Sequence, residues 1–112
     1  MEKKRSKYNA KRTEYNGVVY DSKKEAGYAK KLDLLKMAKG NDKVIKVEKQ
    51  VPFQITVNDK KIAKYILDFK VTYPNRVEHV DVKGMKSGAA YQMFKLKKKL
   101  VEALYDIEII EV

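Results

Sequence analysis

The alternation of apolar and polar residues is clearest in two segments, residues 61–72 and 76–83. The apolar positions that share one face are Leu67, Phe69, Val71, Val80 and Val82. The polar positions between them are Asp68, Lys70, His79, Asp81 and Lys83. Successive side chains of a strand point to opposite faces. The pattern therefore predicts two strands with one face in the core and another that carries polar groups.

A hairpin with a four-residue loop from Tyr73 to Arg76 would join these strands and place Asp68 opposite Asp81. Opposed side chains lie about 5 Å apart at Cβ, and like charges there are destabilising. Two carboxylates about 4 Å apart repel by roughly 4 kcal/mol at an effective dielectric constant of about 20. A divalent cation would offset this repulsion. The alternative is a solvated polar face on which two acids meet by accident.

Apolar spacing predicts a helix that begins after Ser22 and runs to about Lys39, before Gly40. Its apolar stripe consists of Tyr28, Ala29, Leu32 and Leu35, and Glu25 lies on the same stripe one turn earlier. Ser22 and Glu25 also match a capping box, in which the glutamate bonds the backbone of Ser22. Position alone leaves both roles open for Glu25, in capping or in a site.

The remaining segments complete an α/β pattern. Residues 17–21 resemble a short edge strand, and residues 44–57 a strand with Pro52 at a bulge or edge. Asn58 and Asp59 predict a turn, residues 84–88 a flexible loop, and residues 107–112 a last buried strand. Residues 89–105 predict an amphipathic helix with these side chains inward: Met93, Leu96, Leu100, Val101 and Leu104. We expect a mixed central β-sheet of about four to five strands, flanked by two helices.

Composition indicates one folded domain with a polyanionic partner. Of 112 residues, 44% are hydrophobic and 37% charged, and the formal net charge is +11. Residues 1–12 predict a flexible basic arm, and residues 13–112 a single domain. Nucleic acid is the first partner to consider. No apolar run approaches a membrane span, and the absence of cysteine fits a reducing cytoplasm and leaves oxygen ligands for any metal.

The acids fall in the order Glu25, Asp68, Asp81, with Lys83 two residues after the last. With the strings Ser22-Lys-Lys-Glu25, Gln50-Val-Pro52 and Tyr65-Ile-Leu-Asp68, this order resembles the PD-(D/E)xK nuclease superfamily. The likeness is to its small phage-associated, Holliday-junction-resolvase-like and Tn7-type transposition nuclease-like members. The aspartate strand departs from the signature by reading Leu-Asp instead of Pro-Asp. A restriction-endonuclease-like core is the fold that this resemblance implies.

The resemblance implies a metal-dependent DNA endonuclease, acting on branched or otherwise structured DNA, in a bacterial or phage-encoded protein of the bacterial cytoplasm. Its catalytic residues would be Glu25, Asp68, Asp81 and Lys83. The metal would be Mg²⁺, with Mn²⁺ as a substitute, held by Asp68, Asp81, the Val82 carbonyl and Glu25. Lys83 would orient the attacking water; its alternative role is a salt bridge to either aspartate. We expect His79 to be a satisfied or exposed histidine and not a general base.

Basic and polar residues outside this set are candidates for nucleic-acid contact. They are Arg5, Arg12, Gln50, Lys86, Lys95 and Lys99. The alternatives are a solvated edge residue for Gln50 and a solvated helix face for the lysines of residues 97–99. Two other functions stay open: a non-catalytic nucleic-acid-binding module, with RNA included as a partner, or a nuclease-fold subunit active only in a complex. A homodimer would suit symmetric cleavage of two strands.

Overall fold

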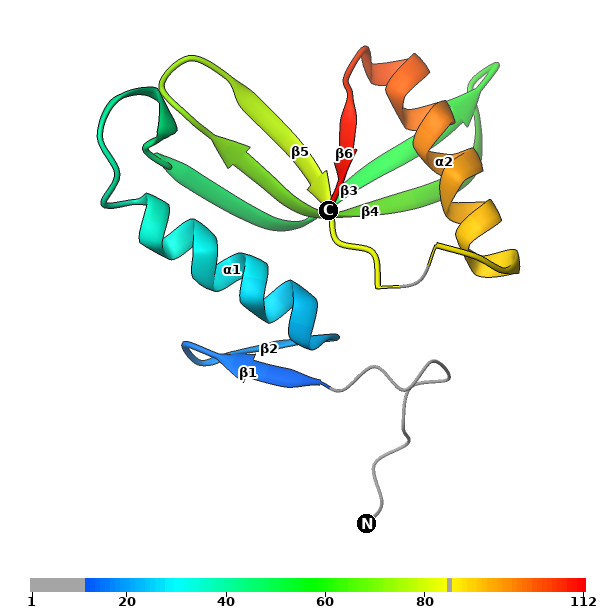
Figure 1. Ribbon diagram of the computed structural model, residues 1–112. Helices are drawn as coiled ribbons and strands as arrows, with labels where there is room; N and C mark the ends of the chain where they lie inside the picture. Colours follow the sequence, from blue (N-terminus) through cyan, green and yellow to red (C-terminus); the bar gives the residue numbers. More distant parts are fainter. Residues whose placement is uncertain (1–11, 85) are drawn as a thin grey trace.

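A long, twisted hairpin is the framework of the fold (Figure 1). The computed structural model describes residues 12–84 and 86–112. In it, β3 (Lys46–Val57) pairs antiparallel with β4 (Lys60–Thr72). Asn58 and Asp59 make the turn with left-handed φ angles of 49° and 62°, which these two residue types tolerate well. β3 is an edge strand, which confirms the edge position predicted for Pro52.

The second hairpin has the register that the sequence predicts. β5 (Val77–Asp81) pairs with β4 so that Phe69 lies opposite Val80 and Lys70 opposite His79. The backbone N–H of Tyr73 donates to the carbonyl of Arg76 at 2.8 Å and closes the four-residue loop. Asp68 and Asp81 occupy the positions that follow the last paired residues, so the predicted opposition of the two acids is confirmed at the level of register.

The central sheet has four strands in the order β3-β4-β5-β6. β6 (Ile109–Glu111) runs parallel to β5, so the sheet is mixed, as predicted. β6 lies at the sheet edge and only Ile109 of this strand is buried, so the last buried strand predicted over residues 107–112 was right about the strand and wrong in part about its burial. A separate hairpin, β1 (Thr13–Tyr15) and β2 (Val18–Tyr20), packs on α1. The sequence predicted β2 as an edge strand and missed β1.

The first helix, α1 (Lys23–Leu35), begins where predicted and ends earlier. Ser22 caps it by accepting a hydrogen bond from the Glu25 backbone N–H at 3.1 Å. The helix stops at Leu35 because the Leu35 carbonyl also accepts the N–H of Val44, which is only 2% exposed. Burial of Val44 thus turns the chain through the short helix η1 (Gly40–Asp42), where the sequence predicted more α-helix.

The second helix, α2 (Ala89–Tyr105), has the predicted bounds, but the predicted inward face is wrong in part. Phe94 and Val101 are its buried residues. Met93, Leu96 and Leu104 are 53%, 54% and 47% exposed. The helix carries two adjacent apolar stripes, and hydropathy alone does not decide which of them faces the sheet.

The odd-numbered side chains of β4 are buried against two different helices. Phe69 and Val71 pack with Leu32 of α1, whereas Tyr65 and Leu67 pack with Phe94 of α2. Figure 1 shows the two helices at different ends of the long hairpin. Asp68 therefore lies where β4 passes from one helix to the other. Among the described residues, neither helix is long and apolar enough to cross a membrane.

Candidate active site

Asp81 is the buried acid at the centre of the candidate site. It is 1% exposed at the end of β5. Its Oδ2 accepts a hydrogen bond from the hydroxyl of Tyr65. The same Oδ2 lies 3.4 Å from the Nζ of Lys83. A carboxylate removed from water requires such partners, so Tyr65 and Lys83 together stabilise the position of Asp81.

Asp68 lies directly beside Asp81. Its Oδ2 accepts the backbone N–H of Val82 at 2.9 Å. Burial, together with the adjacent Asp81 carboxyl, raises the pKa of Asp68 to about 8, against the opposing effect of the Val82 N–H. The strands thus hold two carboxyl groups so close that the protein without a bound cation favours a proton on Asp68 at neutral pH.

Glu25 reaches the same neighbourhood from the first turn of α1. Burial is the largest cause that raises the pKa of Glu25; Asp21 and Asp81 raise it further, and Lys83 lowers it. No hydrogen bond joins its carboxylate to the Ser22 backbone in the described residues, so only the serine half of the predicted capping box forms. The neighbouring Lys24 donates from Nζ to the Lys83 carbonyl at 2.7 Å.

The ammonium of Lys83 has a second neighbour besides Asp81. Its Nζ lies 3.8 Å from the ring centroid of the buried Phe94, close enough for a cation–π interaction. The backbone of Lys83 is fixed as well, because its N–H donates to the Val112 carbonyl at 3.0 Å. The ion pair predicted between Lys83 and Asp81 is therefore present.

The structure brings two of the predicted metal-binding carboxyl groups, Asp68 and Asp81, directly together. Within residues 12–84 and 86–112, no three acidic or histidine side chains lie close enough together to hold a metal ion. Mg²⁺ needs only one or two protein carboxylates, because it retains several waters and also binds substrate phosphates. Asp68 and Asp81 would supply those two carboxylates, and Glu25 lies near enough for the charge of Asp81 to raise its pKa.

Some of the lysines and arginines considered for nucleic-acid contact are exposed, and others already pair with groups of the protein. Lys86, Lys95 and Lys99 are exposed. Lys97 donates to the Lys64 carbonyl at 3.3 Å, and Lys98 pairs with Glu111 at 3.1 Å. Arg12 lies 4.0 Å from Asp21, with both side chains mostly exposed. Arg5 and the rest of the predicted basic arm, residues 1–11, lie outside the described residues.

Gln50 holds a distinctive position at the sheet edge. It lies in β3 between Lys49, which pairs with Phe69, and Val51, which pairs with Leu67, so its place in the register is opposite Asp68. Its φ angle of 51° is uncommon for a residue other than glycine. The side chain is exposed and forms no hydrogen bond with another described residue. His79 is half-buried and packs edge-on against Phe53 with ring centroids 6.1 Å apart, and its side chain forms no hydrogen bond with another described residue.

Sequence reasoning missed three residues that contact the central groups: Tyr65, Lys24 and Phe94. Tyr65 precedes Asp68 by three positions, but its hydroxyl reaches Asp81 on the other strand. The sequence offered one hint of a role for Lys24, namely its position next to the predicted site residue Glu25. Phe94 stood one position from the predicted inward residue Met93.

The chain belongs to the family described as "Protein of unknown function (DUF1064)", whose model matches residues 5–109. Comparison with curated proteins and with solved structures finds no match.

Proposed function

We propose that this protein is a metal-dependent DNA endonuclease with a restriction-endonuclease-like core. The observation that carries the proposal is the pair of adjacent carboxyl groups, Asp68 and Asp81, with the ammonium of Lys83 3.4 Å from Asp81. A pair of acids whose pKa is perturbed by burial and by mutual repulsion is typical of functional sites. The mixed sheet with two helices is compatible with this class of fold.

Each side chain of the site would have a separate role in phosphodiester hydrolysis. Asp68 and Asp81 would hold Mg²⁺, or Mn²⁺ in its place. A bound divalent ion supplies Lewis acidity toward a phosphate oxygen and lowers the pKa of bound water. Lys83, fixed between Asp81 and Phe94, would donate to the attacking water or to the developing charge on the phosphate. Tyr65 holds Asp81 in place, and Lys24 fixes the Lys83 carbonyl beside the site.

The charge of the chain supports DNA as the substrate. A net charge of +11 favours polyanions, and the exposed Lys86, Lys95 and Lys99 follow the site along the chain. If about six to ten phosphates are contacted, affinity should fall about 10³- to 10⁵-fold between 50 and 200 mM salt. Branched or otherwise structured DNA remains the proposed preference, after the resolvase-like members of the superfamily.

The test is a cleavage assay on linear duplex, single-stranded, flapped and four-way DNA with Mg²⁺, Mn²⁺ or EDTA. Asp81→Asn keeps the shape of the side chain and an oxygen for the Tyr65 hydroxyl, but it removes the charge. The matched control is Asp59→Asn in the exposed β3–β4 turn, where asparagine suits the left-handed backbone. We expect metal-dependent cutting by the wild type and by Asp59→Asn, and a loss of at least about 10²-fold in Asp81→Asn.

Cleavage that survives in Asp81→Asn would exclude the acid pair as the catalytic centre. DNA binding without cutting on every substrate, with or without metal, would instead favour the binding module or the subunit that acts only in a complex.

A further inference from the structure

A cavity of about 170 Å³ lies between the β1–β2 hairpin, α1 and β3, apart from the acidic pair. Its lining residues are Tyr15, Asn16, Val18, Tyr20, Ala29, Leu32, Asp33, Lys36, Val47 and Lys49. Drug-sized ligands occupy pockets of roughly 300–1,000 Å³, so this cavity has room for a single small ring system. The share of liquid volume per water is about 30 Å³, so the space exceeds that of one or two waters.

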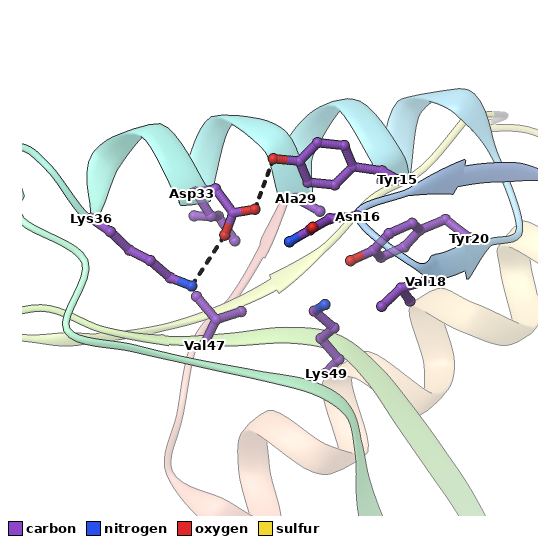
Figure 2. A pocket seen from close by; sticks show the side chains of 10 residues that line it. Tyr15, Asn16, Val18, Tyr20, Ala29, Asp33, Lys36, Val47 and Lys49 are labelled. Atoms are coloured by element: carbon purple, nitrogen blue, oxygen red, sulfur yellow. Dashed lines mark hydrogen bonds and ion pairs between the residues drawn. The ribbon is translucent and has the colours of Figure 1, made fainter.

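The first polar group of this cavity is the hydroxyl of Tyr20. The residue is only 6% exposed, and its ring stacks on Phe69 with centroids 6.3 Å apart. Its hydroxyl forms no hydrogen bond with any described residue. In Figure 2 the hydroxyl points into the cavity, toward the side chains of Asn16 and Lys49. A molecule in the cavity would supply this hydroxyl with the hydrogen-bond partner that the described residues do not.

Asn16 and Lys49 supply two further groups without hydrogen bonds to the described part of the chain. Lys49 places its Nζ 5.2 Å from the Tyr20 ring centroid, with its charge in the cavity mouth. Asn16 has a left-handed φ of 51° in the tight turn before Gly17, which directs its amide inward in Figure 2. The hydroxyl of Tyr20, the amide of Asn16 and the ammonium of Lys49 therefore all face the same cavity.

The polar groups of the opposite wall already have partners within the protein. Asp33 accepts the Tyr15 hydroxyl at 2.8 Å and pairs with Lys36 at 3.1 Å. These two hydrogen bonds lower the pKa of Asp33. The polar groups of this wall thus need no ligand, while the Tyr20, Asn16 and Lys49 side turns its polar groups inward.

We propose that this cavity binds one unpaired nucleotide of a nucleic-acid strand, with the base between Tyr20 and Asn16 and its phosphate on Lys49. A base presents hydrogen-bond donors and acceptors on a planar ring, and its phosphate carries the charge that complements a lysine. Single-strand binding proteins combine aromatic rings and cations in the same way. The proposal rests on the proposed function, because the strand is the one that the acidic pair would cut.

The cavity and the candidate active site both adjoin α1, the cavity through Asp33 and the site through Glu25. Glu25 and Asp33 are eight residues apart on this helix, which corresponds to about 12 Å at 1.5 Å per residue. On β3, Lys49 directly precedes Gln50, whose register position is opposite Asp68. A strand that crosses the sheet edge at Gln50 would therefore place one nucleotide in the cavity and another, a few units away, at Asp68 and Asp81.

The experiment is fluorescence anisotropy in EDTA, so that no cleavage is needed. The probes are a labelled single strand of about 12 nucleotides, within the usual site sizes, and a blunt duplex of the same sequence. The test variants are Tyr20→Phe, which keeps the stacked ring, and Lys49→Ala. Lys60→Ala, at the far turn of the β3–β4 hairpin, is the charge-matched control.

We expect Tyr20→Phe to weaken single-strand binding about 2- to 10-fold, the usual range for one hydrogen bond, and to leave duplex binding and the melting temperature unchanged. Lys49→Ala should weaken single-strand binding more than duplex binding, whereas Lys60→Ala should affect both alike. Wild-type affinity of Tyr20→Phe for the single strand would overturn the proposal.

Competitors distinguish the sources of the ligand. Thymidine monophosphate or inorganic phosphate that displaces the strand from the cavity at equal concentration would overturn the strand-bound nucleotide in favour of a free anion. A wild-type protein that cuts no DNA refutes the proposed nuclease and leaves this binding test intact. If the wild type cuts DNA and Tyr20→Phe binds the single strand as tightly as the wild type, the nucleotide-binding role of the cavity is refuted and the proposed nuclease is not.

Discussion

Replacing Asp68 with asparagine should stabilise the protein in the absence of metal at neutral and alkaline pH. In the folded protein Asp68 is partly buried beside Asp81, and its pKa is raised to about 8. Asparagine imitates the protonated acid: its oxygen can still accept the Val82 N–H, and its amide can donate to Asp81. The substitution removes the repulsion and keeps the hydrogen bond.

The pKa gives both the sign and the size of the effect. The folded-state pKa of about 8 lies above the value of about 3.9 for an unfolded aspartate. The folded state therefore binds the proton more tightly, and stability is lost as pH rises from about 4 through 8. At pH 7, about three units above the unfolded pKa, the loss is at most about 4 kcal/mol. Because Asp68 is only partly buried and water screens its charge, we expect about 2 to 4 kcal/mol.

Thermal and urea unfolding in EDTA between pH 5 and 8.5 measures this difference. At about 4 °C per kcal/mol for a domain of this size, Asp68→Asn should melt roughly 8 to 16 °C above the wild type at pH 7, and the gap should narrow toward pH 5. Burial and Lys70 lower the pKa of His79, so its protonation destabilises both proteins equally below about pH 6.5. An asparagine variant that is less stable than the wild type at pH 8 would refute the reasoning.

Two further substitutions test the neighbourhood of the acids and the core. Tyr65→Phe leaves a buried Asp81 oxygen without its hydroxyl partner and should cost about 1 to 3 kcal/mol in urea unfolding; an unchanged midpoint would mean that water replaces the hydroxyl. Leu32→Ala should cost about 2 to 5 kcal/mol, because Leu32 is 1% exposed, whereas Leu34→Ala, at 65% exposed, should stay within about 0.5 kcal/mol. Equal losses at both leucines would contradict the observed orientation of α1.

The parts of the fold that were predicted correctly depend on patterns within short stretches of sequence. The register of β4 and β5 followed from alternation on both strands and from the length of one loop, since a slip of one residue would expose Phe69 and Val80. The start of α2 followed from the glycine-containing loop of residues 84–88 and its length from the apolar periodicity of residues 89–105; in the structure Asp106 ends the helix with a left-handed φ of 53°. These features depend only on neighbouring residues.

The errors concern packing between distant segments. Val44 ends α1 early by hydrogen bonding to Leu35, a contact that no pattern within the helix announces. α2 turns Phe94 toward Tyr65 and leaves Met93 exposed, because the shape of the sheet selects the face. The hydrogen bond between Tyr65 and Asp81 likewise joins residues 16 positions apart on two different strands, so the residue that holds the central acid was absent from the predicted site.

The charge arrangement links stability to the proposed cation. Although the chain has a net charge of +11, Lys83 pairs with Asp81, and no ion pair among the described residues reaches Asp68, so the charge of an ionised Asp68 is left without a cationic partner there. A divalent cation that binds between the two acids and neutralises this charge should therefore raise the free energy of unfolding. At 100 times its dissociation constant, Mg²⁺ should add about 2.7 kcal/mol to the wild type, measured as a rise in melting temperature at pH 7.5. Asp68→Asn should gain little, because one of its two anionic ligands is gone. An equal rise in both proteins would place the ion elsewhere on the surface and remove the main support for a metal between these strands.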